Sequence, residues 1–213
     1  MTSGTAGIFI TGTDTGVGKT HVGARIIRML RERGIHVAPR KPVESGCKLV
    51  NGELVPADGT ALMDAASQDH LNQVTPYRFE AALAPPVAAS LEGQDIRLKQ
   101  LVEACHSSPN EFLVVEGAGG FFSPVASDGL NAELAVALDL PILLVVADRL
   151  GCINHCLLTI EAIENRGLSI AGIILNQIDT DVTPGNLEEI SSRVSCPVYR
   201  DNELGKAVDS ILD

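Results

Sequence analysis

The chain has 213 residues, of which 45% are hydrophobic and 20% are charged. This length is enough for one sizeable core, so we expect a single domain over residues 1–213. The 27 acidic and 16 basic side chains leave a formal charge of −11, which argues against nucleic acid as a partner. No run approaches the roughly 18 apolar residues of a membrane-spanning helix, and the N-terminus does not resemble a secretion signal. We therefore expect no membrane partner and a cytoplasmic location.

Short apolar runs predict five strands that are buried on both faces. Aromatic residues make up only 3% of the chain, so aliphatic side chains must build the core. Such a composition is typical of a parallel sheet covered by helices. The predicted strands cover residues 7–11, 37–40, 112–116, 142–147 and 170–176.

Longer stretches with a helical spacing of apolar residues lie between these strands. Two such helices cover residues 22–33 and 154–165, and each is followed by a glycine within two residues. Residues 201–213 predict a short closing helix, whereas residues 47–57 and 81–86 are typical of loops. Strands that alternate with helices require right-handed crossovers, which predicts an α/β fold with a mostly parallel sheet and helices on both faces.

The segment from residue 7 to residue 20 reads Gly-Ile-Phe-Ile-Thr-Gly-Thr-Asp-Thr-Gly-Val-Gly-Lys-Thr and predicts a phosphate-binding loop between a strand and a helix. Gly12, Gly16 and Gly18 allow backbone conformations closed to other residues, so consecutive N–H groups can converge on phosphate at the positive end of the helix. Lys19 would then reach the terminal phosphates, and the Thr20 hydroxyl would bind Mg²⁺. The sheet is therefore expected to be P-loop NTPase-like.

This loop is a variant of the usual motif, because Thr13 stands where the pattern has glycine. Asp14 occupies the position at which the variant loops of partitioning and nitrogenase-type ATPases carry a second lysine. The difference weakens an interpretation as a nucleotide-dependent switch. A P-loop ATPase switch of the partitioning or metal-delivery type is nevertheless the alternative function, and a nucleotide-binding module without turnover is a third.

Two acids are candidate ligands for Mg²⁺, which takes hard oxygen ligands and usually one or two carboxylates. Glu116 ends an apolar strand and precedes the glycine-rich segment 117–120, whose backbone N–H groups could approach phosphate. A solvated glutamate at a strand end is the alternative. Asp58 is the weaker candidate, since from spacing alone it could equally be the N-cap of a helix beginning near Ala61.

Lys41 is a candidate second cation, because it follows the second predicted strand. The carboxyl ends of parallel strands meet at one edge of a sheet, so Lys41 would face the crevice into which the phosphate loop opens. Pro42 directs the chain there, and Ser45 and Gly46 supply polar and permissive positions. From the residues alone, a role beside the phosphates and an ordinary surface lysine are equally expected.

The five cysteines are odd in number and scattered, which argues against a disulfide framework. Cys152 and Cys156 are four residues apart and could face each other on a helix as a metal pair, but no cluster of further ligands accompanies them. We expect buried free thiols without a part in the chemistry at Cys47, Cys105, Cys152, Cys156 and Cys196.

Taken together, these segments resemble the dethiobiotin synthetases, which use ATP to close the ureido ring of dethiobiotin from 7,8-diaminopelargonic acid and CO₂. The resemblance covers most of the chain. Residues 41–46, 115–120 and 150–155 are specific to this family at these intervals, whereas the loop at 11–20 is shared with many relatives. The other carriers of the resemblance are Asp58, residues 76–79 and Asn176.

The resemblance implies that Thr20, Asp58 and Glu116 share the Mg²⁺ of a bound ATP. It also implies that Lys19 and Lys41 are the catalytic charges around the transferred γ-phosphoryl group. The implied nucleotide site consists of Gly16, Val17, Gly18, Lys19, Thr20, His21, Asp58, Glu116, Gly117, Ala118, Gly119 and Asn176, the last of these against the base.

The resemblance also implies a substrate site. Thr15 and Ser45 would contact the diamine and its carbamate, and Asn154, at the start of a helix, would help hold the far carboxylate. A helix N-terminus suits that anion because of its free N–H groups and its dipole, although a plain helix cap uses the same geometry. In the family this helix comes from the other subunit, so a homodimer with sites at the interface is implied.

The implied reaction has three steps and needs no nucleophile from the protein. CO₂ forms a carbamate with one amine, the carbamate attacks the γ-phosphorus of ATP, and the second amine displaces phosphate from the mixed anhydride. The chain departs from the family at Gly16, where some members carry an acid, and at residues 84–86, where many have Ser-Pro-His. Residues 198–203 also lack the usual stretch against the base, so the nucleotide preference is not predicted.

Overall fold

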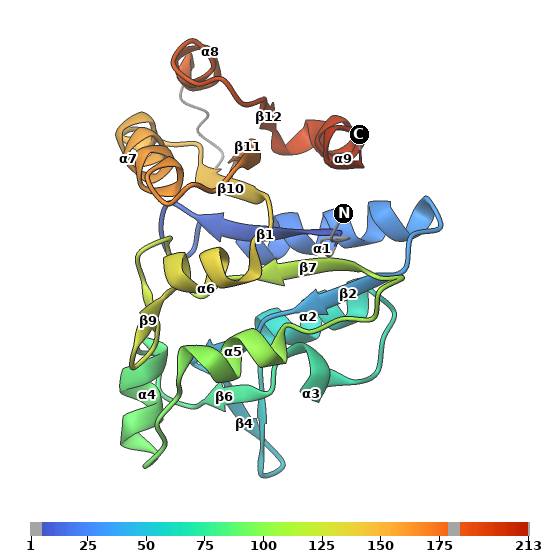
Figure 1. The fold of residues 1–213 in the computed structure, drawn as a ribbon, viewed down its shortest axis with the longest axis vertical. Helices are drawn as coiled ribbons and strands as arrows, with labels where there is room; N and C mark the ends of the chain where they lie inside the picture. Colours follow the sequence, from blue (N-terminus) through green and yellow to red (C-terminus); the bar gives the residue numbers. More distant parts are fainter. Residues whose placement is uncertain (1–5, 179–183, 213) are drawn as a thin grey trace.

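The computed structural model of the chain describes residues 6–178 and 184–212. Its centre is a six-stranded parallel sheet with the strand order β12-β11-β10-β1-β7-β2. Figure 1 shows the strands stacked through the middle of the molecule, from β12 to β2. The strands are β1 (Gly7–Gly12), β2 (Val37–Arg40), β7 (Phe112–Glu116), β10 (Ile142–Ala147), β11 (Ile170–Asn176) and β12 (Val198–Arg200).

The expected α/β fold with a mostly parallel sheet is confirmed. Four of the five predicted strands have the predicted bounds, and β1 is one residue longer. These four runs are apolar over nearly their whole length, as strands buried on both faces require. The sixth strand, β12, was not predicted, because a three-residue strand with the sequence Val-Tyr-Arg has no apolar run to mark it.

Helices cover both faces of the sheet, as predicted. Alternate residues of β1 show this directly, since Ile8 and Ile10 join one buried cluster and Phe9 joins another. The first cluster lies under α1 (Lys19–Glu32), α2 (Ala57–Ala65) and α9 (Leu204–Leu212). The opposite face is covered by α4 (Pro85–Leu91), α5 (Leu98–Ala104), α6 (Asn131–Leu138), α7 (Cys152–Glu164) and α8 (Asn186–Ser191).

The expectation of a loop over residues 47–57 is wrong, because this stretch contains an antiparallel hairpin of β4 (Lys48–Val50) and β5 (Glu53–Val55). Asn51 and Gly52 form its turn with φ angles of 52° and 85°. An Asn-Gly pair between short strands is a strong hairpin signal, because both residues tolerate positive φ. Figure 1 shows this hairpin projecting from the end of the molecule.

Smaller elements complete the chain. The segment 81–86 is a loop as predicted until Pro85, which begins α4 because proline suits the first turn of a helix. The closing helix is confirmed as a short 3₁₀ turn followed by α9, and its last predicted residue, Asp213, lies outside the described residues. The remaining elements are α3 (Leu71–Val74), the parallel pair β3 (Val43–Ser45) and β6 (Tyr77–Phe79), and the hairpin of β8 (Pro124–Ala126) and β9 (Gly129–Leu130).

Within residues 6–178 and 184–212, no helix combines the length and the apolar character that crossing a bilayer requires.

Candidate active site

The predicted phosphate loop connects β1 to α1 at the carboxyl edge of the sheet. Gly16 and Gly18 have φ angles of 73° and 89°, so both use the left-handed backbone that glycine adopts without strain. Gly18 is also the N-cap residue of α1, and having no side chain it leaves the positive helix end open to a ligand. A Cβ atom at Gly18 would lie 2.0 Å from Nδ2 of Asn176, so this glycine is also required by space.

Lys19 begins α1 and is buried, and its Nζ donates a hydrogen bond to the Asp14 carbonyl at 3.0 Å. Burial, followed by the positive charge of Lys41, lowers the pKa of Lys19 to about 8. The loop thus curls around its own lysine, which two nearby carboxylates, Glu116 and Asp58, also help to keep charged. A terminal phosphate placed here would favour the protonated amine still further.

Lys41 is not a surface lysine, because only 3% of the residue is exposed. Its Nζ lies 2.6 Å from Oε1 of Glu116 and 3.1 Å from Oδ2 of Asp58, and it also donates to the Gly117 carbonyl at 3.2 Å. Burial opposes the charge on Lys41, but the two carboxylates outweigh it and raise the pKa of this lysine above its ordinary value. Lys41 is therefore a fixed cation at the end of β2.

The two candidate metal ligands meet at this lysine. Glu116 is 1% exposed, which excludes a solvated strand end, and its Oε1 accepts a hydrogen bond from the Thr20 hydroxyl at 2.9 Å. Asp58 lies in the first turn of α2, which has Pro56 as its N-cap residue, so the alternative of an Asp58 cap is wrong. Burial alone would raise the pKa of Asp58, but the positive charge of Lys41 outweighs it and lowers the pKa.

The residues present fit Mg²⁺ that arrives with a nucleotide. Thr20, Asp58 and Glu116 supply a hydroxyl and two carboxylates, and Oε2 of Glu116 is buried without a hydrogen-bond partner among the described residues. Hard oxygen donors of this kind suit Mg²⁺, which is usually held by one or two carboxylates and by phosphates. In the described ranges no group of three or more His, Cys, Asp or Glu side chains could hold a metal. The phosphates would therefore complete the coordination.

The second glycine-rich segment, residues 117–120, is less free than the sequence suggested. The N–H groups of Gly117 and Ala118 donate to the Ile10 carbonyl at 3.0 Å and to Oδ1 of Asn131 at 3.1 Å, and that of Gly120 donates to a side-chain hydroxyl. These three N–H groups are already satisfied within the protein. The segment forms a wall beside the phosphate loop, since a Cβ at Gly120 would lie 3.4 Å from the Thr13 carbonyl.

Asn131, the first residue of α6, holds this wall in place, and the sequence analysis missed it. It is fully buried, and its Nδ2 donates to the carbonyls of Ala118 at 2.6 Å and Gly120 at 2.8 Å. A Cβ at Gly117 would lie 2.6 Å from its Oδ1, which explains the glycine there. No local pattern marks Asn131, because its partners lie 11 to 13 residues earlier in the chain.

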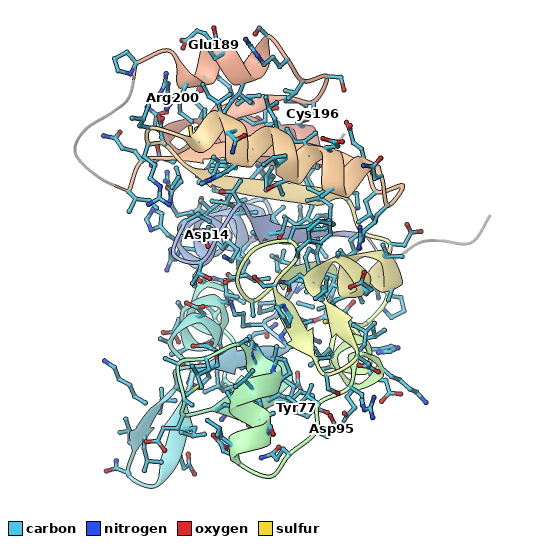
Figure 2. All side chains as sticks on the ribbon, turned by 90° about the vertical axis from the view of Figure 1, so that its left-hand side faces the viewer. Asp14, Tyr77, Asp95, Glu189, Cys196 and Arg200 are labelled. Atoms are coloured by element: carbon cyan, nitrogen blue, oxygen red, sulfur yellow. The ribbon has the colours of Figure 1, made fainter. Side chains whose placement is uncertain are left out.

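Asn176 was expected to contact the nucleotide base, and the structure places it directly behind the phosphate loop. Its Nδ2 donates to the Val17 carbonyl at 3.0 Å, and its main-chain carbonyl accepts the Asp148 N–H at 2.9 Å. Asp148 is buried and is held by Asn186 and by Arg200, which Figure 2 labels. An acid directly after the apolar strand β10 is the signal that singled out Glu116, and it could have found Asp148 as well.

The predicted substrate residues do not join the lysine cluster. Thr15 is exposed on the phosphate loop, and Ser45 donates its hydroxyl to the Leu83 carbonyl at 2.6 Å. Asn154 is exposed in the first turn of α7, and Gly151 is the N-cap residue, so the plain-cap interpretation of Asn154 is wrong. His21 is exposed in the first turn of α1. The roles expected for all four toward a ligand stay predictions.

Two pockets lie near these elements. One of about 500 Å³ opens beside the phosphate loop, between Asp14, the wall and the α7 residue Leu158. Figure 2 labels Asp14, one of the residues that line this pocket. A larger polar pocket of about 620 Å³ lies around Arg40 and Tyr77, but it does not include the lysines or carboxylates described above. The two lysines and their carboxylates line neither pocket, so only its position beside the phosphate loop favours the smaller one.

The cysteines are free thiols, as expected, and four of the five are buried. Cys196 is the exception and is half-buried, and Figure 2 shows it between α7 and α8. Burial raises the pKa of the Cys105 and Cys156 thiols to about 12. Neutral thiols are poor nucleophiles and poor metal ligands, so none of these residues is a candidate for catalysis.

Comparisons with known proteins show which family the chain is related to. A family model described as an AAA domain matches residues 6–199. The ATP-dependent dethiobiotin synthetase BioD of Anaeromyxobacter dehalogenans (strain 2CP-1 / ATCC BAA-258) is 44% identical over 191 residues, covering 87% of this chain and 84% of the relative. The same enzyme of Vesicomyosocius okutanii subsp. Calyptogena okutanii (strain HA) is 38% identical over 201 residues, covering 93% and 91%.

Among solved structures, the septum site-determining protein MinD of Pyrococcus horikoshii OT3, complexed with Mg-ADP, is similar with a TM-score of 0.50. It is 17% identical and the match covers 96% of this chain and 86% of that one, so this likeness shows the fold alone. The P-loop NTPase-like sheet is thereby confirmed. With identities of 38% and 44% over most of both chains, the chain belongs to the family of ATP-dependent dethiobiotin synthetases.

Proposed function

We propose that this chain is an ATP-dependent dethiobiotin synthetase that forms the ureido ring from 7,8-diaminopelargonic acid, CO₂ and ATP. The observation that carries the proposal is the convergence of two buried lysines with two carboxylates and a threonine hydroxyl. Lys41 lies 2.6 Å from Glu116 and 3.1 Å from Asp58, and its charge acts on Lys19. A site of this kind positions and stabilises a transferring phosphoryl group without a covalent step.

In the proposed reaction a substrate amine adds CO₂ and loses a proton to become a carbamate. A carbamate oxygen then bonds to the γ-phosphorus of ATP while the bond from that phosphorus to the ADP oxygen breaks. The second amine attacks the carbamoyl carbon, and the C–O bond to phosphate breaks as the ring closes. The product is dethiobiotin, with ADP and phosphate released.

The residues of the chain have distinct tasks in this sequence. Lys19 and Lys41 neutralise the charge on the γ-phosphoryl oxygens, and the phosphate loop and α1 hold the ATP phosphates. Bound Mg²⁺, held by Thr20, Asp58 and Glu116, would supply further positive charge to the phosphates. Thr15 and Ser45 are proposed to contact the diamine and its carbamate, and Asn176 the base.

We also propose a homodimer in which Asn154 helps hold the substrate carboxylate from the other subunit. Apolar side chains beside the phosphate loop support a partner there. Phe122 is 51% exposed and Leu158 is 59% exposed, both line the 500 Å³ pocket, and Leu150 just before α7 is 90% exposed. Neighbouring exposed apolar residues of this size are typical of an interface. Light scattering of the purified protein should give a dimer mass, and Leu158→Glu should shift it toward the monomer.

The alternative is a nucleotide-dependent switch of the partitioning type. It shares the sheet and the loop, but it does not need a buried Lys41 between two carboxylates, and Asp14 replaces the second lysine of such loops. Measuring phosphate release separates the two. A synthetase releases phosphate only when diaminopelargonic acid and bicarbonate are both present, and forms dethiobiotin in equal amount. Slow phosphate release at the same rate with or without the diamine and bicarbonate would refute the synthetase activity.

A further inference from the structure

The start of helix α2 lacks an acceptor of its own. The first N–H groups of a helix have no partner within the helix, and Ser, Thr, Asp or Asn at the N-cap usually satisfies one of them. Here the N-cap residue is Pro56, whose side chain cannot accept a hydrogen bond. The helix carries Asp58 in its first turn, so its beginning must be held in another way if Asp58 is to have one position.

The missing acceptor is Glu44, which comes from the short strand β3. Its Oε1 accepts the Asp58 N–H at 3.0 Å, and its Oε2 accepts the Gly59 N–H at 2.9 Å. Glu44 is 7% exposed, so water competes little for these bonds. A carboxylate also complements the positive end of the helix dipole. Both oxygens of one side chain thus hold two consecutive N–H groups, which fixes the direction as well as the position of the helix start.

The platform that carries Glu44 is itself ordered. Strand β3 pairs with β6, with Glu44 opposite Arg78. Three residues earlier, the backbone N–H of Lys41 donates to the Val74 carbonyl at 2.8 Å. The other side of the helix start is closely packed, since a Cβ at Gly59 would lie 2.0 Å from the hydroxyl oxygen of a neighbouring threonine. The helix start therefore has little room to move.

Asp58 is consequently held at two points by one short segment. Lys41 contacts its carboxylate, with 3.1 Å between Nζ and Oδ2, and Glu44 holds its backbone N–H. We propose that Glu44 is a positioning residue, which orients Asp58 toward the nucleotide-bound metal by anchoring the first turn of α2. Glu44 touches neither the phosphates nor the metal in this account. The inference rests on the metal site of the proposed function.

Replacing Glu44 should weaken metal binding while the variant still folds. Partners that orient metal ligands typically contribute about 10- to 100-fold in metal affinity. Glu44→Ala removes both acceptors. Glu44→Gln keeps the size of the side chain but turns one acceptor into an NH₂ group facing an N–H donor. Exposed Glu53, in the neighbouring hairpin, offers the matched control Glu53→Gln.

The test titrates Mn²⁺, as a paramagnetic substitute for Mg²⁺, into the full-length protein with bound ADP. Water-proton relaxation separates Mn²⁺ on the protein from Mn²⁺ on free ADP. Both Glu44 variants should bind Mn²⁺ about 10- to 100-fold more weakly, with ADP affinity measured without metal little changed. Glu53→Gln should match the parent chain. Should Glu44→Ala fail to fold, Glu44→Gln decides the question.

A double-mutant cycle distinguishes positioning from general structural damage. If Glu44 acts through Asp58, Glu44→Gln should have no further effect on Mn²⁺ affinity in an Asp58→Asn background. Full additivity of the two changes would overturn the proposal, as would a lowered melting temperature with unchanged Mn²⁺ affinity. These titrations contain no diamine and no CO₂. Failure of the parent chain to form dethiobiotin would therefore refute the proposed function. The titrations would still test the positioning role of Glu44, because they do not depend on that reaction.

Discussion

Replacing Lys41 with methionine tests the central feature of the site, because it removes the charge and keeps most of the volume. The side chains of Lys41 and Glu116 are 4% and 0% exposed, and 2.6 Å separates Nζ from Oε1. Lys41→Met therefore leaves a buried carboxylate without its cation. Removing one partner of a buried ion pair typically costs about 3–5 kcal/mol. At about 2–4 °C per kcal/mol for a chain of this size, the melting temperature should fall by roughly 6–20 °C.

Catalysis should fall by a separate amount. The loss of one preorganised charge at a developing anion typically lowers kcat by about 10²- to 10³-fold, or about 2.7–4 kcal/mol. We expect a decrease of at least about 100-fold in kcat for dethiobiotin formation, with a modest change in the affinity for ATP. The assay is phosphate release in the presence of the diamine and bicarbonate, measured well below the melting temperature of the variant.

The double variant Lys41→Met with Glu116→Gln separates the two effects. It replaces the unpaired carboxylate by a neutral amide, so much of the lost stability should return, whereas kcat should stay low because both functional groups are absent. Normal turnover by folded Lys41→Met would refute the assignment of Lys41 to the γ-phosphoryl group. A melting temperature unaffected by that change would contradict the buried ion pair itself.

Three further predictions concern the loops and thiols. Gly18→Ala should destabilise the protein more than Gly16→Ala in calorimetry, because both have positive φ but only the first would place a Cβ 2.0 Å from another side chain; equal losses would contradict this. Asn131→Leu should lower the urea midpoint, because the Ala118 N–H and the carbonyls of Ala118 and Gly120 lose their hydrogen-bond partner. Each such group costs about 1–3 kcal/mol when it is buried unpaired. An unchanged midpoint would show that the wall at residues 117–120 does not depend on this amide. Burial raises the pKa of Cys47 and Cys105 to about 11 and about 12, so at pH 8 only about a thousandth or less of either thiol is ionised. Mass spectrometry should find both unmodified by iodoacetamide in the native protein and labelled in urea, and rapid native labelling would refute the burial.

Most of the central sheet could be predicted because the signals that define it are local. Four strands are apolar runs with sharp ends, and the phosphate loop is a continuous stretch of glycines before Lys19 and Thr20. The β4–β5 hairpin carried an equally local signal at Asn51 and Gly52, which the sequence analysis overlooked. Strand β12 had none, since a three-residue strand is defined by its neighbour β11.

The amino-acid sequence by itself determined five of the six strands of the central sheet and the phosphate loop, because each depends on residues that are adjacent or regularly spaced along the chain. Only the tertiary structure decided between a surface and a buried Lys41, and between Asp58 as a helix cap and Asp58 in the first turn of α2 beside Lys41. The physical reason is that burial and charge pairing depend on distance in space, and the atoms involved come from segments up to 96 residues apart. Asn131 and Glu44 belong to the same class, since each satisfies backbone groups of a distant turn that no local pattern reveals.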